Sequence, residues 1–134
     1  MESPPSLSSL ERFLDELVTT NLELDVLVLF LAEPAHGWLP EAVAQRLIFS
    51  VEVCEDTLER LRARGLLVSR VGAGYWFAPA SPELAAGAER LWAAYRESPV
   101  DVLRLLNERA VARIRRGARR TFLDAMPRPK PNSR

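Results

Sequence analysis

The segment LELDVLVLFLAE, residues 22–33, constrains the fold most, because its apolar side chains fall on nearly every side of a helix. Asn21 can cap this helix at its start, and Pro34 stops it. A helix that is apolar all round is typical of the buried centre of a domain. The sequence therefore predicts a globular core built around residues 22–33.

Helical spacing of apolar residues, with capping residues at the starts and Pro or Gly at the ends, predicts a mainly α fold with one small β-hairpin. Helices are expected over 7–19, 22–33, 40–47, 51–64, 82–97 and 99–126, and strands over 66–69 and 74–78. Residues 7–97 are expected to form one domain, followed by a basic amphipathic helix over 98–126. Residues 1–6 and 127–134 are expected to be disordered.

Composition excludes several classes of protein. The chain has 134 residues, of which 48% are hydrophobic, so it can bury the core of one domain. Its longest apolar run, residues 26–32, is too short to cross a bilayer, and the N-terminus lacks the pattern of a secretory signal. One cysteine and one histidine exclude a disulfide framework and the usual zinc clusters. We expect a cytoplasmic protein without metal or cofactor, and the bias for Arg over Lys suggests a bacterial source.

Charge is divided unevenly along the chain, although the formal net charge is zero. Residues 1–103 hold 8 Arg against 16 Asp and Glu, a net charge of −8. Residues 104–134 hold 10 Lys and Arg against 2 acids, a net charge of +8. This division indicates either a basic segment with its own partner, or an acidic body and a basic tail that attract each other.

The expected helix over 51–64 and the hairpin after it have a clear inner face. Ser50 is a good N-cap for the helix, and Gly65 is a good stop. Inward positions are expected at Val51, Cys54, Leu58, Leu61, Leu66, Val68, Tyr75 and Phe77. Cys54 is then a small buried hydrophobe, and Trp76 points the other way, towards solvent or a partner.

The segment LERLRARGLLVSRVGAGYWFAP resembles the winged helix-turn-helix family, in which a helix ending in Leu-x-x-x-Gly-Leu passes directly into a wing. The resemblance covers residues 22–79. The junction YWFAPASPEL is similar to that of small bacterial winged-helix proteins, regarded as transcriptional regulators, that carry additional C-terminal helices. The resemblance implies a winged-helix regulator of transcription. No nucleophile, paired-carboxylate or phosphate-binding motif stands out, so we do not expect an enzyme.

The outer face of the helix over 51–64 is acidic, which is unusual for a helix that reads DNA. The four outward acids are Glu52, Glu55, Asp56 and Glu59. They would repel the phosphates on both sides of a major groove, since affinity for DNA rests largely on Lys and Arg. A purely structural explanation is that these acids stabilise the helix, through its dipole and through ion pairs with nearby arginines. Base-reading roles are therefore not assigned to this helix.

Two functions remain open. In the first, double-stranded DNA is bound by the wing and the C-terminal helix, and the candidate residues are Arg62, Arg64, Arg70, Arg109, Arg113, Arg115, Arg116, Arg119 and Arg120. In the second, the four acids and Trp76 bind a basic protein partner. An apolar stripe on the C-terminal helix is expected to dock on the domain or to dimerise, with the six arginines of residues 109–120 on the opposite, outer face. The stripe consists of Leu103, Leu106, Ala110, Ile114, Ala118, Phe122 and Ala125. We expect a homodimer formed through the N-terminal helix, the C-terminal helices or both.

Overall fold

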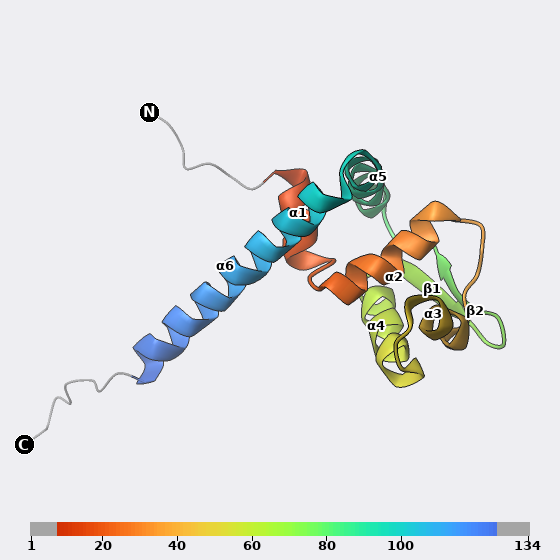
Figure 1. Ribbon diagram of the computed structural model, residues 1–134, viewed down its shortest axis with the longest axis horizontal. Coiled ribbons are helices and arrows are strands. Elements are labelled where there is room, and N and C mark those ends of the chain that lie inside the picture. Colours follow the sequence, from red (N-terminus) through yellow and green to blue (C-terminus); the bar gives the residue numbers. More distant parts are fainter. Residues whose placement is uncertain (1–7, 126–134) are drawn as a thin grey trace, which may run out of the picture.

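The computed structural model describes the backbone of residues 8–125 and the side chains of residues 8–119. It is mainly helical with one small antiparallel hairpin, as the sequence predicts (Figure 1). The elements in chain order are α1 Ser9–Glu16, α2 Asn21–Ala32, α3 Pro40–Leu47, α4 Val51–Ala63, β1 Leu67–Arg70, β2 Gly74–Phe77, α5 Pro82–Glu97 and α6 Pro99–Ala125. The predicted disorder of 1–6 and 127–134 lies outside the described residues.

Helix α2 forms the centre of the core, as its apolar sequence predicts. Leu24, Leu27 and Phe30 are fully buried along it, and α2 contacts α3, α4, α5 and β2. Burying each such side chain stabilises the fold by roughly 1.5–3 kcal/mol. The helix is capped by Thr20, whose hydroxyl accepts from the Glu23 backbone N–H at 3.0 Å, rather than by Asn21 as predicted.

Helix α4 passes into the hairpin through Gly65, whose positive φ of 87° favours glycine over residues that carry a side chain. Strands β1 and β2 are paired antiparallel, with Val68 opposite Trp76. The expectation that Val68 faces inward is wrong, because Leu66 and Leu67 together fill the core and turn Val68 outward. The backbones of Trp38 and Tyr75 exchange two hydrogen bonds, which tie the hairpin to the loop before α3.

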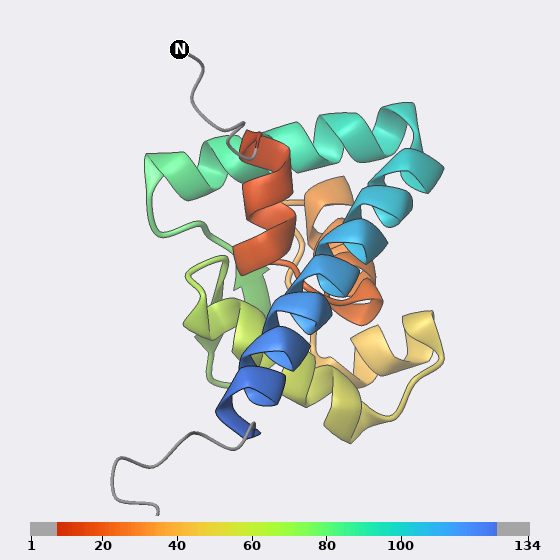
Figure 2. The same ribbon diagram turned by 90° about the vertical axis from the view of Figure 1, so that its left-hand side faces the viewer.

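Helices α1, α5 and α6 pack together beside the unit formed by α2, α3, α4 and the hairpin. Phe13 of α1 approaches α5 so closely at Gly87 that a Cβ there would lie 2.7 Å from its ring. Figures 1 and 2 show α6 crossing beside α1, with its C-terminal end lying far from α5. Among the helices that the structure describes, none is both long and apolar enough to span a membrane.

A buried acid joins α2 to α4. Glu23 is almost fully buried, and its carboxylate accepts hydrogen bonds from Arg60 at 3.2 Å and Arg64 at 2.6 Å. It also accepts from the Thr19 backbone N–H at 2.7 Å. Burial alone would raise the pKa of Glu23, but the hydrogen bonds from Thr19 and Arg64 and the charge of Arg64 outweigh it and lower the pKa below its ordinary value.

We therefore expect Glu23→Gln to lower the free energy of unfolding by about 2 kcal/mol at pH 7, measured by urea denaturation. Because the folded-state pKa is lowered, the carboxylate's contribution is present above the unfolded-state pKa. It is lost as the pH falls through the folded-state value. The difference between wild type and Glu23→Gln should therefore shrink towards pH 3, while exposed Glu16→Gln changes little. An unchanged difference between pH 7 and pH 3 would contradict this account.

Candidate interaction surfaces

The four acids of α4 lie on its exposed face, as the sequence predicts. Together with Tyr75 of β2 they line a shallow hollow of about 350 Å³. The opposite face of the helix is buried at Cys54, Leu58 and Leu61, which agrees with the predicted inner face. Burial raises the pKa of the Cys54 thiol, as expected for a cysteine that packs as a hydrophobe.

Two of these acids are held by neighbouring side chains. Asp56 pairs with Arg60 at 2.6 Å. Glu59 pairs with Arg62 at 2.9 Å and accepts a hydrogen bond from the Tyr75 hydroxyl at 2.5 Å. The Arg62 hydrogen bond, followed by that of Tyr75, lowers the pKa of Glu59. Burial and the Glu59 carboxylate raise the pKa of Tyr75 to about 12.

Glu52 and Glu55 are the other two acids, and neither forms an ion pair with a described residue. Both are exposed on the first turns of α4. Acids near the N-terminus of a helix interact favourably with its dipole, which accounts for their presence at these positions. They leave the α4 face with two uncompensated negative charges.

The hairpin presents Arg70 and Trp76 side by side. The Arg70 guanidinium lies 5.2 Å from the centre of the Trp76 ring, a cation–π contact. Trp76 points away from the core, as predicted, but it is half-buried because its ring covers Gly37, where no Cβ would fit. Its indole Nε1 is buried without a hydrogen-bond partner among the described residues. The prediction of a solvent-facing tryptophan is therefore only partly correct.

The arginines predicted to lie beside the wing are already engaged. Arg64 donates to the buried Glu23 carboxylate and, at 2.8 Å, to the Leu17 carbonyl. Arg62 lies along α4 against Glu59. Any phosphate bound by Arg64 would have to displace a partner that has no other access to water, since Glu23 is buried.

Three arginines of α6 converge on one acid of α1. Asp15 forms ion pairs with Arg109 at 3.5 Å, Arg113 at 3.0 Å and Arg116 at 3.6 Å. Arg113 also donates to the backbone carbonyls of Leu14 and Asp15 at 3.3 Å each and of Thr19 at 3.0 Å. The expectation that Arg109 and Arg113 lie on the outer face of α6 is wrong.

The reason is that α6 follows the predicted stripe only at its start, where Leu106 is buried and Leu103 and Ala110 are partly buried, and then turns a different line of residues inward. Val102 and Leu106 are buried, and Arg109 and Arg113 continue their line along α1 with their stems covered. Ile114, predicted to face inward, is 68% exposed. The predicted stripe also included Ala118, which is exposed, and Phe122 and Ala125, whose side chains lie outside the described part.

The remaining candidates of the basic set lie on the last turns of the described helix. Arg115 and Arg119 are exposed, and no ion pair joins either to a described residue. The side chain of Arg120 lies outside the described part of the chain. The predicted nucleic-acid set is thus divided among internal ion pairs, the hairpin and this exposed end of α6.

Sequence reasoning missed Asp15 and Glu23 as organising residues. Glu23 is an acid inside an apolar run, which indicates a buried charge that requires a partner. Its partners are Arg60 and Arg64, at the C-terminal end of α4. Asp15 gave no such signal, because its partners follow about a hundred residues later. Among the described residues no group of histidine, cysteine and acid side chains could hold a metal ion.

Comparison with known proteins adds no assignment. No family model matches the chain, and neither a curated protein nor a solved structure matches it.

The contacts of α6 predict different costs for two of its arginines. Arg113→Ala should lower the free energy of unfolding by about 2 kcal/mol, because it removes hydrogen bonds to Asp15 and to three backbone carbonyls of α1 and the loop after it. Arg119→Ala, on the same helix, should change it by less than about 0.5 kcal/mol. Chemical denaturation of both variants measures the difference. Equal costs would mean that Arg113 does not hold α6.

Proposed function

We propose that this chain is a non-catalytic winged helix-turn-helix module that binds a basic partner protein through the acidic face of α4. The element order supports the fold assignment, because three helices, α2 to α4, lead directly into the β1–β2 hairpin. The turn at Gly65 and the backbone bridge between Trp38 and Tyr75 hold that hairpin against the helices. A cytoplasmic setting remains a prediction.

One observation carries the proposed function: Glu52 and Glu55 form no ion pair with a described residue, on a face where all four acids border the hollow beside Tyr75. Negative charge on an exposed helix favours encounter with a basic protein surface. It opposes insertion of the same helix between two phosphate backbones. Tyr75 lines the hollow but is itself buried, and its hydroxyl donates to Glu59 and so fixes that carboxylate on the face.

The distribution of cations supports the same conclusion. Arg109, Arg113 and Arg116 all pair with Asp15, a cluster that keeps a net charge of +2, and Arg64 pairs with Glu23. Binding of DNA through these side chains would break ion pairs within the fold. The net free energy gained from each phosphate would fall accordingly.

Double-stranded DNA is a second candidate partner, and the exposed end of α6 favours it. Arg115 and Arg119 form no ion pair with described residues, and Arg70 extends from the hairpin. These cations could bind phosphates without sequence reading by α4. In this case the chain would be a regulator of transcription, as the family resemblance implies.

A homodimer is part of the same proposal. Helix α1 is already covered by α5 and α6, so its apolar residues Phe13 and Leu14 are used within the fold. The outer face of α6 instead exposes several apolar side chains. Such a face on a small protein usually has a partner, and we assign the dimer to α6.

Affinity capture with matched bait proteins tests the docking proposal. The acidic-face variant carries Glu52→Gln with Glu55→Gln, and the control carries Glu89→Gln with Glu97→Gln, two exposed acids of α5. We expect a basic protein to bind wild type and control, and to bind the acidic-face variant about tenfold more weakly when purified and titrated by calorimetry. Higher salt should weaken this binding.

Fluorescence anisotropy with labelled mixed-sequence duplex DNA at low salt decides between the two candidates. The docking proposal predicts no binding at micromolar protein. Salt-dependent binding that is lost in Arg115→Ala with Arg119→Ala, and is kept in the acidic-face variant, would favour the DNA candidate. Equal capture of partners by wild type and acidic-face variant would contradict docking on α4.

A further inference from the structure

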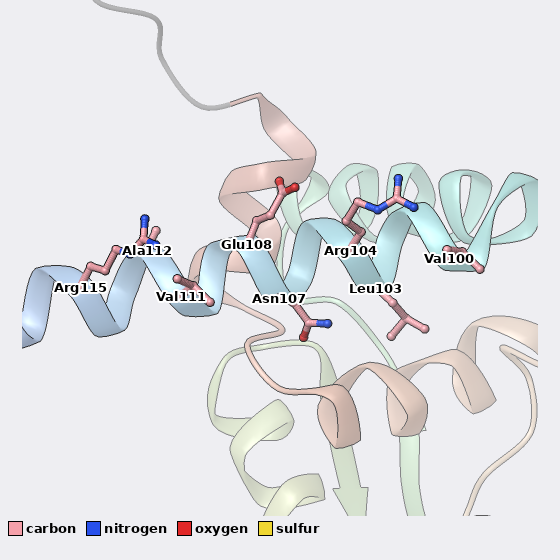
Figure 3. Close-up of a pocket in the computed structure, with 8 residues that line it drawn as sticks. All are labelled: Val100, Leu103, Arg104, Asn107, Glu108, Val111, Ala112 and Arg115. Carbon is pink, nitrogen blue, oxygen red and sulfur yellow. The ribbon is translucent and has the colours of Figure 1, made fainter.

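A narrow stripe along α6 is formed by Val100, Leu103, Asn107, Val111 and Ile114, of which Leu103 is partly buried against the core and the other four are exposed. Val100 is 63% exposed, Val111 44% and Ile114 68%. The stripe borders a groove of about 660 Å³, also lined by Arg104, Glu108 and Arg115 (Figure 3). Within the described part of the chain the groove is lined by α6 residues alone.

The spacing of the stripe is symmetric about its polar residue. Leu103 and Val111 lie four residues before and after Asn107, and Val100 and Ile114 lie seven residues before and after it. At 3.6 residues per turn these five positions fall within a strip about 80° wide. A helix with this pattern presents the same order of apolar and polar positions when it is turned end over end.

We propose that two copies of this chain pair through α6, antiparallel, about a two-fold axis that passes beside Asn107. This inference rests on the proposed homodimer and specifies its interface. It places Val100 against Ile114 of the second copy, and Leu103 against Val111. The two Asn107 side chains meet at the axis and hydrogen-bond to each other, and a buried Asn pair of this kind fixes register and orientation.

The charges beside the stripe fit the same arrangement. Asp101, Arg104, Glu108 and Arg115 all project from one edge of it, where Asp101 and Arg104 already pair at 3.3 Å. In an antiparallel pair, each edge meets the same edge of the partner helix. Glu108 then lies within two residues, about 3 Å along the axis, of Arg104 of the second copy.

Arg115 lies equally close to Asp101 of the second copy. Each of these four charges thus faces its opposite, and the two-fold axis repeats each pair. A parallel pairing would bring the charged edge against the other edge of the stripe. That edge is next to Leu106 and Arg113, which lie against α1, so it has no room for a second helix.

Cysteine crosslinking tests this register directly, because the chain's one cysteine, Cys54, is buried. Asn107→Cys should form an intermolecular disulfide on mild oxidation, since a two-fold axis brings this position to its own copy. Val100→Cys or Ile114→Cys alone should not crosslink, whereas an equimolar mixture of the two should. Val111→Glu should convert the dimer to a monomer in sedimentation at tens of micromolar, with unchanged circular dichroism.

The outcomes separate this pairing from the proposals on which it stands. A wild-type monomer at tens of micromolar would overturn both the homodimer and the pairing. A wild-type dimer in which Asn107→Cys does not crosslink, or in which Val100→Cys crosslinks to itself, would overturn the pairing alone. Neither result bears on docking at Glu52 and Glu55, which lie on α4.

Discussion

The Asp15 carboxylate joins α1, the first helix, to α6, the last. It lies on α1 and draws in three arginines from α6, of which Arg113 also donates to backbone carbonyls at the end of α1. These contacts fix the rotation of α6 about its own axis. That rotation decides which side chains of α6 are covered, and therefore which face remains for a partner.

The same contacts explain the uneven charge of the sequence. The sequence left open whether the basic segment serves an external partner or attracts the acidic body. Within the described part of the chain, acids and arginines of the fold attract each other. Arginines of α6 pair with Asp15, and Arg60 and Arg64 pair with Glu23. Acids without an ion-pair partner are left on α4, and exposed arginines are left at the far end of α6. A basic protein would bind these acids of α4, and DNA would bind these arginines of α6.

Much of the fold was predictable from local patterns. Ser50, Gly65 and Pro40 mark helix ends where the structure has them, and the apolar segment 22–33 lies at the centre of the core. Capping and helical periodicity depend on residues a few positions apart, so helix ends and buried faces of this kind can be predicted directly from the sequence. The reversal of Val68 arises because two adjacent leucines, Leu66 and Leu67, are both buried, which strict alternation along a strand does not predict.

The face that α6 buries was predictable at its start, where Leu106 is buried, but not from residue 109 onward. An amphipathic pattern assigns apolar residues to the inside, but arginine stems also cover apolar surface when an acid holds their charged ends. Arg109 and Arg113 behave so because Asp15 lies nearly a hundred residues earlier in the chain. Ile114 is consequently exposed. Two faces of this helix are comparably apolar, so which of them is buried depends on the long-range ion pairs to Asp15.

A double-mutant cycle between Asp15→Ala and Arg113→Ala tests the central claim most directly. If Asp15 holds α6 through Arg113, the two substitutions should not be additive. The coupling energy from chemical denaturation should then be about 1.5 kcal/mol or more. Additive costs, with a coupling below about 0.3 kcal/mol, would contradict the account, because Asp15 and Arg113 would then act independently and not as a pair that holds α6.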